Sequence, residues 1–306
     1  TMAGLTRILG QDRLKSPELE WTGEANPESL TSALARRWAS DGLNRLSLGI
    51  QSFQPAALQW LRRLHGPQEA LRAVREAREA GLENINVDLI FGLPGILERS
   101  WKDDLEAVLA LEIPHVSVYG LSVEEGTPLA AAIAEGRVPG PEEHVFREEF
   151  LEAHRILTAE GYRHYEVSNF ALPGFEARHN LACWSRSPYL GLGNSAHSFQ
   201  GHRRRWNLRS WHAYQSACLE GRRPWESEEL LSAAEVRLER IWLGLRTEDG
   251  VPLEQLGRRA RALGEDWERE GLAVIGPGAL RLTPLGWLVL DRLTVALDLA
   301  EGESGG

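Results

Sequence analysis

The chain has 306 residues, is 42% hydrophobic and carries a formal net charge of −10 from 44 acidic and 34 basic residues. No stretch approaches the roughly 20 uninterrupted apolar residues that span a bilayer, the first residues lack the pattern of a secretory signal, and the negative charge opposes binding to nucleic acid. We therefore expect a cytoplasmic protein with no transmembrane segment and no nucleic-acid partner, long enough for more than one domain.

The first half of the chain repeats a strand followed by a helix. Strands are predicted at 19–24, 45–51, 84–91 and 115–121, and helices at 29–40, 56–64, 68–80 and 99–111. Gly42 and Gly81 stand where helices should end, in positions that favour a left-handed backbone. The repeated order of strand, helix and strand implies right-handed crossovers and a parallel sheet, and hence an α/β fold.

Each predicted strand carries a stripe of polar residues at every second position. Successive side chains of a strand point to opposite faces, so each stripe lies on one face and apolar residues cover the other. The striped face consists of Thr22, Glu24, Ser47, Gly49, Gln51, Asn84, Asn86, Asp88, Ser117 and Tyr119. Ordinary parallel barrels fill their interior with Val, Ile and Leu. The pattern therefore predicts a partial parallel barrel whose lumen holds a polar ligand.

Three residues of this face stand at the carboxyl ends of their strands: Glu24, Gln51 and Asp88. Active sites of parallel barrels lie at these ends, so the three side chains should converge on one ligand. Carboxylates accept hydrogen bonds from ribose hydroxyls or an amino group, and a glutamine both donates and accepts. One such residue often only caps a strand end, whereas three at matching positions favour a binding site.

The second half is less regular. A long helix is predicted at 142–160, short strands at 162–208, and helices near 209–220, 228–245 and 254–270. The stretch 279–286 before a last helix resembles a wing, which predicts a small winged-helix-like domain. Residues 228–306 hold nine basic and 15 acidic residues, the wrong charge for a duplex, so we interpret this domain as a packing module. The predicted domains are 1–140, 141–224 and 225–300, with a tail at 301–306.

Cysteine and arginine usage adds two observations. Cys183 and Cys218 are 35 residues apart without a Cys-x-x-Cys pair, so neither a disulfide framework nor a metal site follows from the cysteines alone. The run of Arg203, Arg204 and Arg205 after His202 is typical of a solvated loop, and the alternative is a site for phosphate or carboxylates.

Several motifs, in order along nearly the whole chain, resemble the radical S-adenosylmethionine proteins related to oxygen-independent coproporphyrinogen III oxidase. They are Glu24-Ala-Asn-Pro27, Gly49-Ile-Gln-Ser-Phe53, Leu61-Arg-Arg-Leu-His65, Asp88-Leu-Ile-Phe-Gly-Leu-Pro94, Tyr119-Gly-Leu-Ser-Val-Glu-Glu-Gly-Thr127, Tyr165-Glu-Val-Ser-Asn-Phe170, Arg178-His-Asn-Leu-Ala-Cys-Trp184 and the segment 189–199. The resemblance implies a partial (β/α) barrel of the radical S-adenosylmethionine type, followed by a mixed α+β region and the winged-helix-like domain.

The resemblance also implies a cofactor pocket. Glu24 would bind the ribose of S-adenosylmethionine, and Ser122 would lie near the adenine. Gln51, Arg63 and Asp88 would complete the pocket. The strand pattern places Glu24, Gln51 and Asp88 on one face independently of the resemblance. Arg63 depends on the resemblance, because one of two adjacent arginines on a helix is usually a solvated charge.

The segment from His179 to Trp184 resembles the His-Asn-x-x-Tyr-Trp motif of the heme chaperone branch, HemW. The resemblance implies heme binding through His179, Asn180 and Trp184, since histidine is a common axial ligand of heme iron and an indole stacks on a porphyrin. Cys183 stands where that branch usually has tyrosine, which removes a phenol and supplies a thiol that ligates iron when ionised. His197 is a second candidate ligand, and a structural role is the alternative for either histidine.

Two motifs of the family are absent from the chain: a Cys-x3-Cys-x2-Cys loop and a Gly-Gly-Thr-Pro segment. In the family, three cysteines hold a 4Fe-4S cluster that binds S-adenosylmethionine. We therefore expect a fragment that lacks its N-terminal region, with the cluster ligands upstream and the strand 19–24 at a sheet edge. The alternative is a natural paralogue that has lost the cluster. Reductive cleavage of the cofactor is not expected from the residues present.

The leading hypothesis is a heme chaperone that holds heme or a porphyrin and delivers heme to an accepting protein. One alternative is a coproporphyrinogen III dehydrogenase, in which the arginines at 203–205 would bind the propionates that the enzyme decarboxylates. Another is a barrel that only binds a nucleoside or a tetrapyrrole without catalysis.

Overall fold

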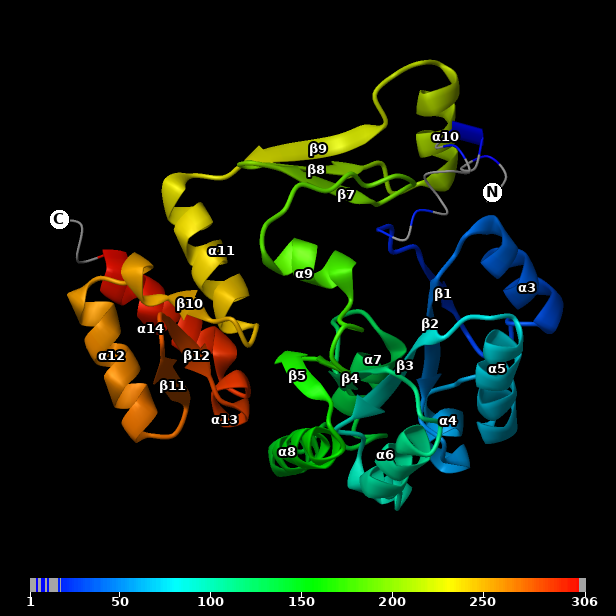
Figure 1. The fold of residues 1–306 in the computed structure, drawn as a ribbon, viewed down its shortest axis with the longest axis horizontal. Helices are drawn as coiled ribbons and strands as arrows, with labels where there is room; N and C mark the ends of the chain where they lie inside the picture. The colour runs from blue at the N-terminus through cyan, green and yellow to red at the C-terminus, as the bar shows by residue number, and fades with distance from the viewer. Residues whose placement is uncertain (1–3, 5–6, 9, 11–15, 17, 303–306) are drawn as a thin grey trace. The chain divides into compact units, whose positions relative to one another are not determined.

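The computed structural model describes residues 4, 7–8, 10, 16 and 18–302 (Figure 1). The chain divides into two compact units, Thr1–Glu176 and Ala177–Gly306. The boundary predicted at residue 140 falls inside the first unit, and the three-domain division stays a prediction. Among the described residues, no helix combines the length and the apolar character that crossing a membrane requires.

A six-stranded sheet forms the centre of the first unit, in the order β1-β2-β3-β4-β6-β5. Neighbouring strands from β1 to β4 are parallel, whereas β6 pairs antiparallel with β4 and with β5. The strands are β1 (Thr22–Ala25), β2 (Arg45–Gln51), β3 (Asn84–Phe91), β4 (His115–Gly120), β5 (Arg163–Glu166) and β6 (Asn169–Ala171). The predicted α/β fold with a parallel sheet is confirmed, and β1 is the edge strand of this sheet.

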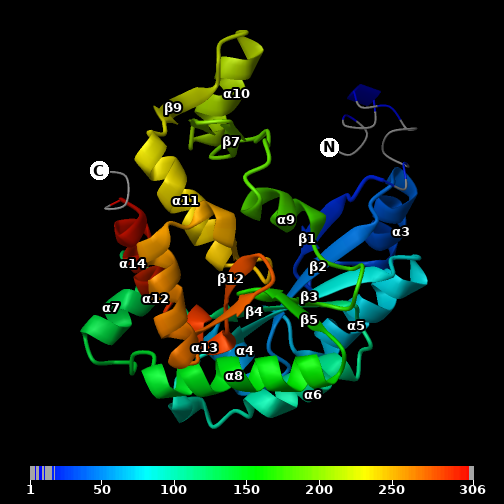
Figure 2. The same cartoon turned by 60° about the vertical axis from the view of Figure 1, so that its left-hand side comes forward.

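Helices connect and cover the strands of this sheet (Figure 1, Figure 2). They are α3 (Ser32–Asp41), α4 (Pro55–Trp60), α5 (Pro67–Glu79), η1 (Gly95–Leu97), α6 (Trp101–Leu109), α7 (Pro128–Ala134) and α8 (Glu143–Ala159). Thr31 begins α3 by accepting a hydrogen bond from the Leu34 N–H, and Gly42 ends it with φ 109°. Gly81 follows α5 with φ 88°, so both predicted glycine stops adopt the left-handed conformation.

The apolar stripe of the strands lies in the core, as predicted. Leu46, Leu48 and Ile50 of β2 are fully buried, and so are the matching residues of β3, which are Ile85, Val87 and Leu89. Helices α5, α6 and α8 pack on the sheet. Burial of each of these side chains contributes about 1.5–3 kcal/mol, so the opposite face can carry polar groups while the sheet stays anchored.

The second unit contains two three-stranded antiparallel sheets, ordered β7-β8-β9 and β10-β12-β11. The strands are β7 (His197–Gln200), β8 (Arg203–Asn207), β9 (Trp225–Leu230), β10 (Val251–Pro252), β11 (Ala273–Gly276) and β12 (Ala279–Leu282). The helices are α9 (Arg178–Trp184), α10 (Trp211–Leu219), α11 (Ala233–Leu245), η2 (Leu253–Gln255), α12 (Arg258–Arg269), α13 (Pro284–Trp287) and α14 (Leu290–Gly302). The β11–β12 hairpin packs with α12 and α13, as the winged-helix-like interpretation requires.

Two local predictions in this unit were wrong. The helix predicted at 228–245 begins at Ala233, because residues 225–230 form β9 and Ser232 starts the helix in a capping box with Glu235. The arginines at 203–205 lie in strand β8 and not in a loop. Pairing of β8 with both β7 and β9 satisfies its backbone and sends alternate arginines to opposite faces of the sheet.

Candidate functional site

The polar face of the first unit is a continuous hydrogen-bonded network across β2, β3 and β4. Asn86 Nδ2 donates to Ser47 Oγ and to Asp88 Oδ1, both at 2.7 Å. Ser47 Oγ donates to Asp88 at 3.2 Å, and Ser117 Oγ donates to Asn86 Oδ1 at 3.1 Å. The network follows the strand register, which sets Ser47 opposite Asn86 and Asp88 opposite Ser117. Hydrogen bonds from Asn86 and Ser47 thus orient the Asp88 carboxylate.

His115 of β4, which the sequence analysis did not single out, lies opposite Asn86 in the strand register. Its Nδ1 is 2.6 Å from Asn86 Oδ1 and its Nε2 is 2.8 Å from the Tyr165 hydroxyl. Burial and the charge of Arg45 hold the pKa of His115 well below its usual range, so the ring is neutral. A neutral imidazole with a partner on each nitrogen fixes the amide of Asn86, and through it the carboxylate of Asp88.

Burial raises the pKa of Asp88, and the nearby charge of Glu24 adds to this effect, while hydrogen bonds from Asn86, Ser117 and Ser47 oppose it. Burial likewise raises the pKa of Tyr119, with Asp88 as the next cause. The charge of Glu24 therefore acts on Asp88 at one end of the sheet. A ligand that donates hydrogen bonds or carries positive charge would stabilise both carboxylates.

Arg63 is not the solvated charge that its own sequence context favoured. Its Nη2 donates to the Gly49 carbonyl at 2.9 Å and to Asn26 Oδ1 at 3.2 Å. A Cβ atom at Gly49 would lie 3.0 Å from Arg63 Nη2, 3.1 Å from Gln51 Nε2 and 3.2 Å from Asn26 Oδ1. Three polar side-chain tips thus meet over Gly49 in space that any other residue would fill.

Gln51 ends β2 in an unusual backbone conformation, with φ 72°. A left-handed backbone is uncommon outside glycine and is often found at functional sites, where the surroundings hold it in place. Here the next three residues of the chain hold this conformation through their hydrogen bonds to α6 and to the residue before it. Ser52 Oγ and the Phe53 N–H both donate to Asp104 of α6, at 2.8 and 2.7 Å, and Gln54 exchanges two hydrogen bonds with the backbone of Ser100.

The loop after β3 is held by the same buried charges. Glu149 of α8 accepts from the Gly92 N–H and from Arg99, and Arg99 also pairs with Asp104. The Arg99 side chain is 3% exposed and that of Asp104 is 0% exposed. One ionic group therefore fixes the loops that follow β2 and β3, the neighbouring strands that carry Gln51 and Asp88.

The other two predicted cofactor residues are exposed. Glu24 lies on β1 opposite Ser47, where its charge reaches Asp88. Ser122 follows β4, and its hydroxyl donates to Glu124 at 2.6 Å. The structure thus brings Glu24, Gln51, Arg63 and Asp88 to one end of the sheet. For Ser122 it shows the local bond to Glu124.

The predicted heme-binding residues lie in the second unit. His179 and Cys183 are one turn apart on α9, with Nε2 and Sγ separated by 3.7 Å. Burial raises the pKa of the Cys183 thiol, which disfavours the thiolate needed to ligate iron. The Trp184 ring stacks against the Arg246 guanidinium at 4.7 Å. Asn180 is half-buried on the same helix.

A cavity of about 130 Å³ adjoins this helix, with Cys183, Trp184 and Leu243 in its wall. The Trp184 indole N–H is buried, with no hydrogen-bond partner among the described residues. A buried donor without a partner costs about 1–3 kcal/mol, and an acceptor on a ligand would offset that cost. His197 lies on β7, exposed, with its ring stacked on Trp206 at 6.0 Å.

Cysteine chemistry is confined to the second unit. The chain has two cysteines, Cys183 and Cys218, and both are free thiols. Across the described residues, no group of three or more His, Cys, Asp and Glu side chains could hold a metal ion. The described residues therefore do not supply three thiolates for a 4Fe-4S cluster.

Sequence reasoning missed Asn26, His115 and the Asp104–Glu149 group. Asn26 belongs to the motif Glu24-Ala-Asn-Pro27. It precedes Pro27, which marks it as a turn residue at a strand end. His115 begins a strand, and Asp104 and Glu149 sit in helices, where acidic residues usually face solvent. Their roles depend on contacts 29–57 residues apart in sequence, which no local pattern reveals.

The chain is similar to known proteins over nearly its whole length. Residues 3–108 match the family model of the radical SAM superfamily. The chain is 33% identical to the heme chaperone HemW of Mycobacterium tuberculosis (strain ATCC 25618 / H37Rv), over 96% of this chain and 78% of the relative. It is also 33% identical to the heme chaperone HemW of Bacillus subtilis (strain 168), over 88% of this chain and 73% of the relative.

A solved structure with the same fold is that of coproporphyrinogen III oxidase (HemN) from Escherichia coli, a radical SAM enzyme. It matches 97% of this chain and 74% of its own length with a TM-score of 0.74, at 19% sequence identity. At this identity the likeness concerns the fold alone.

Proposed function

The chain belongs to the heme chaperone HemW family of radical SAM proteins, and we propose that it holds heme and delivers it to a heme-accepting protein. The observation that carries the proposal is the motif on α9. There the His179 ring is exposed, the Cys183 thiol lies 3.7 Å from it, and the Trp184 indole lines the adjoining cavity. An exposed imidazole beside an aromatic wall is suited to bind heme iron and stack on the macrocycle.

The strand ends of the first unit have a supporting role in this proposal. Radical SAM proteins use S-adenosylmethionine with a 4Fe-4S cluster, and the polar face of this unit suits the nucleoside part of that cofactor. Glu24 and Asp88 would accept bonds from ribose hydroxyls or the amino group, and Gln51 and Arg63 would donate. Ser122 would lie beside the adenine. A cytoplasmic location and a protein acceptor for heme belong to the same proposal.

Hemin titration of the chain tests the proposal. We expect a Soret band shift on binding to the wild type, and a loss of affinity of about tenfold or more in His179→Ala when the iron loses its ligand. His197→Ala reports on the second candidate. His212→Ala is the matched control, because His212 is an exposed histidine on α10 outside the motif.

One outcome would favour the dehydrogenase alternative instead. Conversion of coproporphyrinogen III by a form of the protein that carries a 4Fe-4S cluster, with no hemin binding by the wild type, would contradict the chaperone function. The likeness to coproporphyrinogen III oxidase concerns the fold alone, and the motif on α9 favours the chaperone.

A further inference from the structure

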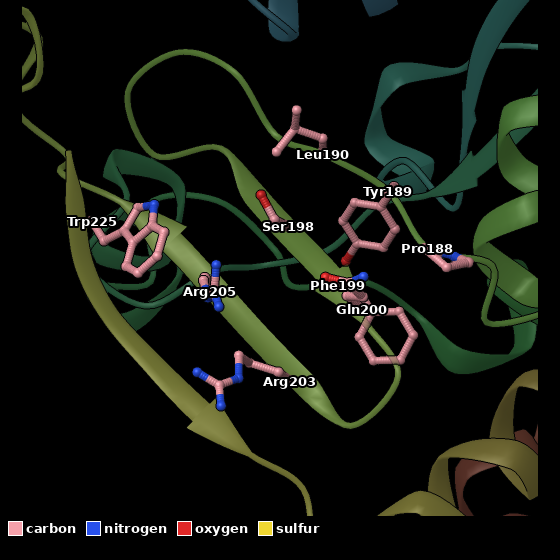
Figure 3. Close-up of a pocket in the computed structure, with 9 residues that line it drawn as sticks. All are labelled: Pro188, Tyr189, Leu190, Ser198, Phe199, Gln200, Arg203, Arg205 and Trp225. Atoms are coloured by element: carbon pink, nitrogen blue, oxygen red, sulfur yellow. The ribbon is translucent and has the colours of Figure 1, made fainter. Parts of the chain in front are cut away.

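A second cavity, of about 310 Å³, lies on the β7-β8-β9 sheet of the second unit (Figure 3). Its wall contains two arginines of β8, Arg203 and Arg205, and apolar or aromatic residues that include Tyr189, Leu190 and Trp225. Its volume is at the lower end of the range for small-molecule sites, about 300–1,000 Å³. Neither the family comparison nor the motif on α9 assigns a function to it.

The strand register places the two arginines on one face of the sheet. Arg203 pairs with Gln200 and Arg205 with Ser198, and Gln200 and Ser198 also line the cavity. Arg204 points to the opposite face, where it binds Glu229 and Glu239. Because side chains alternate along β8, Arg204 bonds to two carboxylates on one face of the sheet, and Arg203 and Arg205 face the cavity on the other.

These two arginines share a single carboxylate. Arg203 Nη1 donates to Glu228 Oε2 at 3.1 Å, and Arg205 Nε donates to the same oxygen at 3.1 Å. Each guanidinium has five N–H donors, so both keep donors for a further acceptor. Glu228 also shows that a carboxylate can bridge the two groups at this spacing. A ligand carboxylate can therefore take the place of Glu228 between the two arginines.

The aromatic wall adds a preference for a flat ligand. The Arg205 guanidinium lies 4.1 Å from the centre of the Trp225 ring, and Arg223 lies 5.0 Å from it. In Figure 3, Trp225 and Tyr189 lie on opposite sides of Arg205. Leu190 extends the apolar wall with 76% of its surface exposed. A ligand with carboxylates at one edge and an apolar flat body matches this arrangement.

The cavity adjoins the heme motif through a common wall. Tyr189 and Phe199 line it and also line the smaller cavity beside Cys183 and Trp184. The aromatic pair is joined by the Tyr189–Phe199 backbone bridge. Because Phe199 pairs with Arg204, the smaller cavity lies on the Arg204 face of the sheet, opposite to Arg203 and Arg205, and the two cavities meet at the Tyr189–Phe199 edge.

We propose that this cavity receives the propionate edge of the porphyrin, and that Arg203 and Arg205 bind its carboxylates in exchange for Glu228. The proposal rests on the proposed function, and it assigns the carboxylate end of the cargo to a site separate from the iron ligand. Trp225 and Tyr189 flank the edge of the macrocycle. Exchange with an internal carboxylate keeps binding reversible, which suits a protein that must release its cargo.

Hemin and hemin dimethyl ester, in which both propionates are esterified, test the proposal with the same set of variants. We expect the Arg203→Gln/Arg205→Gln double variant to bind hemin about 10–100-fold more weakly, because charge-assisted hydrogen bonds are lost. The ester should bind the wild type and the double variant equally. Glu228→Gln should bind hemin severalfold more tightly, because it frees the arginines from a competing charge.

Arg209→Gln is the matched control, because Arg209 is an exposed arginine whose side chain is 83% accessible and which does not line the cavity. The Soret maximum should not move in the double variant, since the iron ligand is unchanged. Hemin affinity unchanged in the double variant would overturn the site while leaving the chaperone function standing. Unchanged affinity in Glu228→Gln would overturn the exchange, and no hemin binding by the wild type would overturn the proposed function itself.

Discussion

The strand ends of the first unit and the motif region of the second differ in how their polar side chains are bonded. In the first, Asp88, Asn86 and Ser47 bind one another through buried hydrogen bonds. In the second, the Trp184 indole N–H is buried without a partner among the described residues, and Arg203 shares one exposed glutamate with Arg205.

This difference indicates that the two regions bind different kinds of ligand. A prearranged polar wall costs little reorganisation when it binds, which suits a cofactor held in one orientation. An open surface with a donor to spare and an exchangeable carboxylate suits cargo that enters and leaves.

Asp104→Ala should damage the first region most. The substitution removes the Asp104 carboxylate that pairs with the buried Arg99. It also removes the acceptor of the Ser52 hydroxyl and of the Phe53 N–H. We expect the free energy of unfolding to fall by about 3–5 kcal/mol in denaturant titrations. Glu106→Ala is the control on the same helix, where an exposed pair with Lys102 contributes at most about 0.5 kcal/mol. Equal effects would contradict the assigned role of Asp104.

Acid should weaken the first unit through its buried histidines. Burial and the neighbouring His154 lower the pKa of His164 from 6.5 to about 3. A depressed histidine pKa contributes stability that is present above pH 6.5 and is lost as the pH falls toward 3. His164→Phe, which keeps the stacking on Phe170, should gain about 2–4 kcal/mol relative to the wild type over that range. The exposed His212→Phe should show no such change in thermal unfolding.

Gly49→Ala should weaken ligand binding more than folding. The new methyl group would displace the tips of Arg63, Gln51 and Asn26, which can move because they are side-chain ends. We expect about tenfold weaker binding of S-adenosylhomocysteine by calorimetry and a loss of about 1 kcal/mol in stability. Gly140→Ala, whose nearest neighbour is Ile133 at 3.7 Å, should change neither quantity. A Gly49→Ala protein that binds as the wild type does would remove the cofactor site from Gly49.

Arg203→Gln should have the smallest effect on stability. The Arg203–Glu228 pair is 46% exposed on both sides, and such pairs contribute about 0–1 kcal/mol. The melting temperature of the variant should therefore stay close to that of the wild type. A large drop would show that the arginine supports the sheet and is not held for a ligand.

Local patterns were sufficient to predict the parallel sheet. The boundaries of β2 and β3 agree with the sequence prediction to the residue, because alternation and glycine stops are local. The same alternation placed Ser47, Asn86 and Asp88 on one face. It was insufficient for β9, where five of six residues are exposed and the polar run gives no burial signal against a helix.

The site was predicted less completely than the fold. Glu24, Gln51 and Asp88 were placed together because strand ends of a parallel sheet share an edge. The bonds of Arg63 to Asn26 and Gly49, and the buried group around Asp104, depend on tertiary packing between distant segments. Periodicity cannot show them, since a helical arginine or aspartate has the same pattern whether it faces solvent or a buried partner.

Hydrogen–deuterium exchange of the chain with and without hemin tests the contrast between the two regions most directly. We expect hemin to slow exchange in residues 178–206 and 225–230, around α9 and the β7-β8-β9 sheet, and to leave β2 and β3 unchanged. Slowed exchange confined to the strand ends after Gln51 and Asp88 would contradict it, because heme would then occupy the polar face assigned to the cofactor.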